Sequence, residues 1–271
     1  MSLSADPSRQ HRTAYEWSDE ARARQRPLRW MWDTFSFFLV LGVLAIGFSV
    51  WSLLAALLTP ILPRQVGRRL GQSAINVWFS LFLFMMRVLG IARCDLTALD
   101  AVRDARGVVF AANHMALLDI LLLGARLPRT VCIIKASLYR NPLLGGGRLA
   151  GYICNDDAVR LVRRAASALR EGSNLLIFPE GTRYPAGQLG PFRRSFALIA
   201  KQARAPVRAI FIETNSPYLR KSWPLWRRPT FPLEYRVRVG PPQFVDGDAE
   251  AFCEEFRAHF LAKAQSPIFG P

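Results

Sequence analysis

The sequence predicts an α/β fold with a largely parallel sheet flanked by helices, preceded by a membrane-embedded helix and an amphipathic interfacial helix. Short β-rich runs alternate with helical patterns from about residue 93 onward, which is typical of a parallel sheet with helices on its faces. A segment of 25 residues without a charge, residues 34–58, lies before them. We therefore divide the chain into a basic flexible leader (1–30), membrane-anchoring helices (31–92) and an α/β domain (93–271).

The uncharged segment 34–58 is long enough to span a bilayer, which takes about 20 apolar residues. Trp30 and Trp32 precede it, where an aromatic belt would lie. A signal peptide does not fit, because the leader is too long and no small-residue cleavage site follows. We expect a spanning or embedded helix that ends at Pro60 and Pro63; a buried core helix is the alternative.

A second apolar segment, residues 70–86, is shorter and is interrupted by polar residues. Arginines flank it on both sides, so the distribution of positive charge does not decide the orientation of the pair. We expect an interfacial or re-entrant helix rather than a second full span. A hairpin that enters one leaflet, with both ends cytoplasmic, fits the charges equally well.

The α/β domain is expected to contain strands and helices in alternation. The strands are expected at 107–113, 129–136, 174–180 and 205–213, with 233–240 as a further strand at an edge. The helices are expected at 115–127, at 158–172 with Gly172 as the C-cap, and at 248–264.

The chain is strongly basic, with 36 Lys and Arg against 20 Asp and Glu and a formal net charge of +16. Such an excess favours an anionic partner, namely nucleic acid, anionic lipid or an acidic carrier protein. No signature of a nucleic-acid-binding fold is present. The four cysteines form no CxxC or Cys/His metal pattern, and we expect them to be buried free thiols.

The segment 110–120, FAANHMALLDI, places a histidine and an aspartate in apolar sequence. We expect His114 on the turn after a strand and Asp119 in the first turns of the next helix. There the carboxylate can orient the imidazole and raise its basicity, which leaves the histidine able to deprotonate a substrate hydroxyl. No G-x-S-x-G accompanies the pair, so an α/β-hydrolase is excluded. A structural turn histidine, with Asp119 as a helix cap, is the alternative.

A second candidate site is the segment 177–187, IFPEGTRYPAG, at the end of another strand. Gly181 lets the backbone approach a ligand, and Thr182 and Arg183 offer groups that suit a phosphate. The alternative is a turn with a surface ion pair between Glu180 and Arg183. A third candidate, Lys135 followed by Gly145–Gly147 between Arg140 and Arg148, would be a phosphate-cradling loop, although it is not a P-loop.

The motifs NHMALLD (113–119) and FPEGTR (178–183) resemble the two hallmark motifs of the glycerolipid acyltransferases, in the family's order. The resemblance covers roughly residues 65–240 and is closest to the bacterial 1-acylglycerol-3-phosphate (lysophosphatidic acid) acyltransferases. The chain departs from the family pattern at Asn155–Asp157, at Ser195 and at Ala209. We expect these departures to affect the identity of the acceptor rather than the reaction.

The resemblance implies a role for each matching residue. His114 is the expected general base and Asp119 its orienting acid. Asn113 is placed with the substrate-binding residues. Lys135 and Arg183 would hold the phosphate of the acceptor, with Glu180, Gly181 and Thr182 shaping that site.

The same resemblance implies no metal and no cofactor, with acyl-CoA or acyl-ACP (acyl carrier protein) as co-substrate. The expected partners are membrane lipids, a lysophospholipid acceptor and the thioester donor, with no nucleic acid. The expected location is the bacterial inner membrane, with the site facing the cytoplasm. Two alternatives remain, namely another lyso-lipid acceptor (ornithine-lipid or aryl-polyene-associated) and a non-enzymatic, membrane-anchored basic binding module.

Overall fold

The computed structural model describes residues 27–114, 116–139, 141, 145–182, 189–220 and 223–264. Within these residues, seven strands form one sheet in the order β1-β7-β6-β2-β5-β3-β4. Every neighbouring pair is parallel except β6 and β7, which are antiparallel. The strands are β1 (Ala92–Asp95), β2 (Val109–Ala112), β3 (Thr130–Lys135), β4 (Ile153–Asn155), β5 (Asn174–Ile177), β6 (Val207–Thr214) and β7 (Leu233–Gln243). The predicted α/β class with a largely parallel sheet is confirmed.

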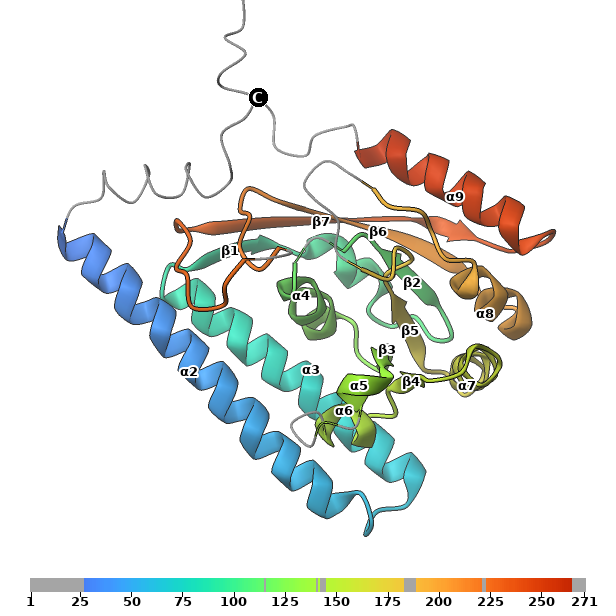
Figure 1. Cartoon of the computed structure of the whole chain (residues 1–271), viewed down its shortest axis with the longest axis horizontal. Coiled ribbons are helices and arrows are strands. Elements are labelled where there is room, and N and C mark those ends of the chain that lie inside the picture. The colour runs from blue at the N-terminus through green and yellow to red at the C-terminus, as the bar shows by residue number, and fades with distance from the viewer. Residues whose placement is uncertain are drawn as a thin grey trace, which may run out of the picture.

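Helices cover both faces of the sheet (Figure 1). One face packs on α2 (Pro27–Leu58), α3 (Arg64–Val88) and α4 (Leu118–Arg126), and the other on α7 (Ala158–Arg170), α8 (Ser195–Ala203) and α9 (Ala249–Ala264). The central strands are therefore buried on both sides: Phe110 and Ala112 enter the first core, whereas Val109 and Ala111 enter the second. Such strands are continuous apolar runs because neither face meets water.

Helix α2 begins at Pro27, so residues 27–30 of the predicted leader are helical, and residues 1–26 lie outside the described part of the chain. Proline is favoured in the first helical turn because it lacks the N–H that would be unsatisfied there. The helix ends at Leu58, before Pro60 and Pro63, as expected. Among the described residues, α2 is the one helix long and apolar enough to cross a membrane. At about 1.5 Å per residue it is roughly 48 Å long.

The polar residues that interrupt the second apolar segment attach α3 to the α/β unit. Asn76 Nδ2 donates to the carbonyl of Gly124 at 2.8 Å, and Ser80 Oγ donates to that of Ala125 at 2.9 Å. Both acceptors lie in the last turn of α4, whose carbonyls lack partners within their own helix. The side of α3 that faces away from its buried residues is an exposed apolar stripe, formed by Val66, Leu70, Val77, Leu81, Phe84 and Val88.

The expectation that the strand at 233–240 lies at an edge is wrong. This strand, β7, lies between β1 and β6, and the short β1 forms the edge. The alternating pattern of β7 arises because Leu233, Tyr235 and Val237 enter the core while the residues between them are half-buried. Two strands, β1 and β4, were not predicted, since runs of four and three residues carry little periodicity.

The glycine-rich segment does not form a phosphate cradle in its described part. Residues 145–149 form a short helix, α6 (Gly145–Leu149), that packs against α2 and α3. A Cβ on Gly145 would lie 2.7 Å from the backbone oxygen of Ser52, and one on Gly146 would overlap the Trp51 ring. The glycines therefore serve the close approach of helices. Arg148 donates to the carbonyl of Tyr139 at 3.1 Å, and Arg140 lies outside the described residues.

This packing predicts that Gly71→Ala destabilises the protein. Gly71 of α3 is buried, and an added Cβ would lie 2.5 Å from the backbone nitrogen of Ala150. Backbone cannot move aside as a side chain can, so we expect a loss of about 1–3 kcal/mol in the free energy of unfolding. Thermal unfolding in detergent measures it. Gly42→Ala is the matched control, because a Cβ there meets nothing within 4 Å. Equal unfolding temperatures for the two variants would contradict this packing.

Candidate active site

Three of the predicted site residues lie at one edge of the sheet, where neighbouring parallel strands end. His114 follows β2, Glu180 follows β5, and Lys135 is the last residue of β3. The order β2-β5-β3 places these ends side by side, and Lys135 lies two strands, about 10 Å, from the strand that leads to His114. This edge is where open α/β sheets bind ligands.

His114 and Asp119 form the pair that the sequence predicted. His114 Nδ1 lies 3.1 Å from Asp119 Oδ2, with the histidine side chain 13% exposed and the aspartate fully buried. Because a carboxylate accepts hydrogen bonds, the proton of the neutral imidazole resides on Nδ1 and Nε2 carries the lone pair. Asp119 Oδ2 also accepts from the backbone N–H of Ala116 at 2.8 Å. The same carboxylate therefore also holds the turn before α4, whereas the N-cap of α4 is Leu117 and no side chain caps it, so Asp119 is not the helix cap considered as an alternative.

An aromatic ring fixes the plane of the imidazole. Phe178, directly after β5, stacks on His114 with ring centroids 4.1 Å apart and an interplanar angle of 24°. The histidine is thus held at its edge by Asp119 and on its face by Phe178. This restricts the imidazole to one orientation, which is what a base acting on a bound hydroxyl requires.

Glu180 links the two motif-bearing turns. Its Oε1 accepts from the backbone N–H of His114 at 3.2 Å, and its Oε2 accepts from that of Gly190 at 3.1 Å. Burial raises the pKa of Glu180 above its ordinary value, and these two hydrogen bonds oppose the rise. With 4% of its surface exposed, Glu180 is a buried carboxylate rather than a surface one. Arg183 lies outside the described residues.

Asn113 is engaged with the sheet rather than with the open edge. Its Nδ2 donates to the carbonyl of Ile212 at 2.9 Å, and the N–H of Ile212 donates to its Oδ1 at 2.7 Å. The side-chain amide thus continues the hydrogen-bonding ladder with β6 after β2 has ended. Both ends of the amide are used in this way, so Asn113 has a structural role in the sheet.

The turn after Glu180 brings in a cation that the sequence analysis did not assign. Gly181 has φ 68°, and a Cβ there would lie 2.6 Å from Nε of Arg193. Glycine meets both requirements, the left-handed backbone and the space. Thr182 and Lys135 are exposed on this edge. Arg193 therefore joins them as a positive group next to the turn.

Arg220 is a second cation near the site that the sequence analysis did not assign, and it interacts electrostatically with Asp119. It lies on the segment between β6 and β7, where the carbonyl of Leu219 accepts from the N–H of Leu117 at 3.4 Å. Burial lowers the pKa of its guanidinium, and the nearby Tyr235 and Asp119 oppose the shift. In a chain with 36 basic residues, nothing local distinguishes this arginine.

Three of the residues that depart from the family pattern have structural roles. Asp157 is the N-cap of α7 and accepts from the backbone N–H of Arg160 at 2.7 Å. Ser195 begins α8. Ala209 is fully buried and lies at a register shift between β6 and β7.

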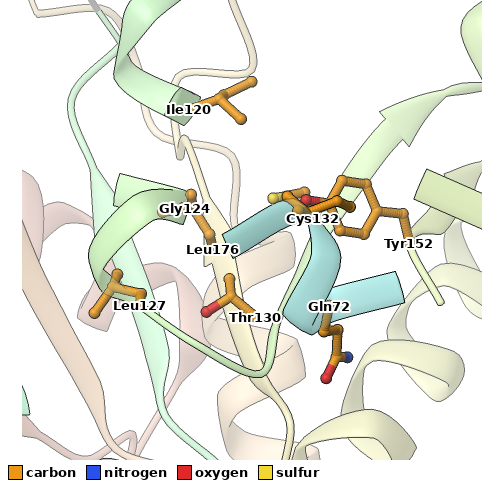
Figure 2. Close-up of a pocket in the computed structure, with 9 residues that line it drawn as sticks. Gln72, Ile120, Gly124, Leu127, Thr130, Cys132, Tyr152 and Leu176 are labelled. Atoms are coloured by element: carbon orange, nitrogen blue, oxygen red, sulfur yellow. The ribbon is translucent and has the colours of Figure 1, made fainter. Parts of the chain in front are cut away.

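The structure gives the cysteines no nucleophilic role. Burial raises the pKa of Cys132 to about 12 and those of Cys94 and Cys253 to about 11, so these thiols stay protonated near neutral pH. Cys132 also lines a small cavity between α3, α4 and the sheet, with room for about one water molecule (Figure 2). Ile120, the residue after Asp119, lines the same cavity.

Comparisons with known proteins agree with this geometry. Residues 93–213 match the family model described as Acyltransferase. The 1-acyl-sn-glycerol-3-phosphate acyltransferase of Pseudomonas aeruginosa is 25% identical over 222 residues, which are 79% of this chain and 82% of the relative. The alpha form from Mus musculus is 28% identical over 226 residues, covering 79% and 77%. The crystal structure of the 1-acyl-sn-glycerophosphate acyltransferase from Thermotoga maritima shares the fold, with a TM-score of 0.64, 20% identity, and coverage of 91% of this chain and 100% of that one.

The contacts of Asn113 predict that Asn113→Ala acts on stability. The substitution leaves the N–H and the carbonyl of Ile212 without their partner, which costs about 1–3 kcal/mol for each buried group. We expect a lower unfolding temperature in a thermal scan. Asn155→Ala, at the exposed end of β4, is the matched control and should unfold like the unaltered protein. An Asn113→Ala protein that unfolds at the unaltered temperature would contradict the structural role.

Proposed function

We propose that this chain, whose residues 93–213 match the family model described as Acyltransferase, acylates the free hydroxyl of 1-acylglycerol-3-phosphate and gives phosphatidic acid. The acyl group comes from a thioester, either acyl-CoA or acyl-ACP. The observation that supports this most directly is the His114–Asp119 pair, 3.1 Å apart at the carboxyl edge of the sheet. The acyltransferase domain speaks against the alternative of a non-enzymatic binding module.

In the proposed mechanism, Nε2 of His114 takes the proton of the acceptor hydroxyl. Asp119 stabilises the imidazolium that forms, since its carboxylate faces the Nδ1–H. The oxygen attacks the thioester carbonyl and forms a tetrahedral oxyanion. Collapse of this intermediate breaks the C–S bond, and the imidazolium returns its proton to the leaving thiolate. No group on the protein is acylated, which agrees with the raised pKa values of the buried thiols.

The phosphate of the acceptor has cationic candidates at the same edge. Lys135 is exposed at the end of β3, and Arg193 lies beside Gly181. We place Lys135, Thr182 and Arg183 in the phosphate site, and add Arg193 on the basis of its position. A guanidinium binds phosphate through two parallel hydrogen bonds, which makes arginine well suited to this role.

We further propose that α2 and α3 embed the enzyme in one leaflet of the bacterial inner membrane, with His114 facing the cytoplasm. Both ends of α2 contact the rest of the protein: Phe37 packs on Tyr218 with centroids 5.8 Å apart, and Ser52 contacts Gly145. Asp33 of α2 also forms a buried ion pair with Arg228 at 3.5 Å. A helix held along its length in this way (Figure 1) would carry the α/β unit into the bilayer if it spanned it. This favours the one-leaflet hairpin.

The proposed chemistry predicts that His114→Ala loses activity without unfolding. Loss of a general base lowers kcat by about 10²–10⁴-fold. Acyl transfer to 1-acylglycerol-3-phosphate by purified protein in vesicles measures it, with acyl-CoA and acyl-ACP donors in parallel. Arg163→Ala, an exposed residue of α7, is the control, and thermal unfolding verifies the fold. A folded and active His114→Ala protein would refute the mechanism. An unaltered enzyme that acylates only another lyso-lipid would refute the acceptor.

The proposed membrane contact predicts that Phe35→Glu and Phe38→Glu weaken binding to lipid vesicles. These side chains are 59% and 53% exposed on α2. Burial of such a ring in an apolar phase contributes about 1.5–3 kcal/mol, so binding should weaken at least about tenfold for each. Vesicle co-sedimentation measures it. Val159→Glu, at a residue that is 67% exposed but lies on α7, should bind like the unaltered protein. Equal effects of all three substitutions would disprove this assignment of the membrane face.

A further inference from the structure

A basic cleft lies at the end of the sheet opposite His114. Three neighbouring parallel strands begin there: Arg106 precedes β2 by three residues, Arg129 directly precedes β3, and Ser173 directly precedes β5. The cleft has a volume of about 340 Å³. Proteins bind small ligands in clefts of about 300–1,000 Å³, so this one has room for a compact ligand. No residue proposed for acyl transfer lines it.

The charge on the cleft is largely uncompensated within the described residues. Four arginines and one glutamate line it, and the glutamate, Glu171, pairs with Arg68 at 2.6 Å. No described residue forms an ion pair or hydrogen bond with the side chains of Arg69, Arg106 or Arg129. Three guanidinium groups that converge on a concave surface attract an anion.

Arg129 has a strained backbone at this cleft. Its φ is 56°, in the left-handed region that residues other than glycine rarely adopt. Its carbonyl accepts from the N–H of Asn174 at 2.8 Å, which fixes the turn, and its Nε is buried without a partner among the described residues. Strained backbone conformations of this kind are frequent at ligand-binding sites, where the strain places a side chain in contact with the ligand. The fold itself gives no reason for an arginine here.

The geometry points to a second binding site, in which Arg69, Arg106 and Arg129 bind the phosphate group of a small ligand. The guanidinium fork matches the geometry of a phosphate group and binds it through two parallel hydrogen bonds. On α3, the cleft residues 65, 68, 69 and 72 lie roughly 140° around the helix axis from the exposed apolar stripe, at about 100° per residue. The cleft therefore opens away from the proposed membrane face, and the phosphate belongs to a soluble ligand. This site does not depend on the proposed acyl transfer.

Calorimetric titration of the full-length protein in detergent with inorganic pyrophosphate, and with inorganic phosphate, tests the site. We expect saturable binding that weakens as the salt concentration rises. Arg69→Ala and Arg106→Ala should each weaken it by about tenfold, the effect of losing a charge-assisted hydrogen bond. The control is Arg163→Ala, an exposed arginine of α7 outside the cleft, which should bind like the unaltered protein.

Arg129→Gly separates a binding role from a structural one. Glycine adopts the left-handed backbone freely, so the unfolding temperature should not fall while binding weakens. A lower unfolding temperature with unchanged anion binding would show that Arg129 has a structural role and does not bind the anion.

A second arm identifies the source of the phosphate. Vesicles of phosphatidylcholine are compared with vesicles that contain phosphatidylglycerol. A preference for the anionic vesicles that Arg69→Ala abolishes, without pyrophosphate binding, would overturn the soluble ligand and assign the cleft to a lipid headgroup. No Arg69-dependent binding in either arm would overturn the site.

Discussion

The carboxylate of Glu180 is the contact on which the arrangement of the active edge depends. It accepts hydrogen bonds from the backbone N–H groups of His114 and Gly190. It therefore joins the turn after β2 to the chain that follows β5. A buried carboxylate is tolerated only when such donors replace water, and each hydrogen bond to a charged group contributes about 1.5–3 kcal/mol. Because Glu180 contacts the backbone of His114, it positions this residue independently of the orientation of the imidazole ring. Asp119 and Phe178 then orient the imidazole, at its edge and on its face.

Helix α3 serves three surfaces of the molecule at once. Its apolar stripe faces outward, its polar residues Asn76 and Ser80 bind the end of α4, and its first turns border the arginine cleft. Asn76 and Ser80 contact the last turn of α4 and Asp119 lies in its first turn, so α4 connects α3 to the acid that orients the base. Under the two proposals, the ends of the sheet bind different ligands, an acyl acceptor at the carboxyl end and a soluble anion at the amino end.

The sequence predicts those parts of the site that local spacing determines. The five-residue interval between His114 and Asp119, with a helix beginning between them, was enough to place both groups. The role of Asn113 was missed because its partner, Ile212, is 99 residues away and the pairing exists only in the assembled sheet. The glycines of α6 were misread for a similar reason, since the α2 helix that they approach lies about 90 residues earlier. Neither Arg193 nor Arg220 stands out in a chain so rich in arginine. The strand β7 was misplaced because alternation of apolar and polar residues indicates burial on one face, not the position of the strand in the sheet.

The central claim is that Asp119 holds the proton of His114 on Nδ1 and leaves Nε2 free to act as the base. The chain has only three histidines, so ¹⁵N-labelled histidine gives a spectrum simple enough to assign with a His114→Ala reference. The measurement is the tautomer of His114 in the neutral form, from the chemical shifts of the two ring nitrogens. The account predicts a protonated Nδ1 and an unprotonated Nε2, and a shift of this population in Asp119→Asn. A neutral His114 protonated on Nε2 would contradict the account, because the atom that faces the substrate would then have no lone pair to accept a proton.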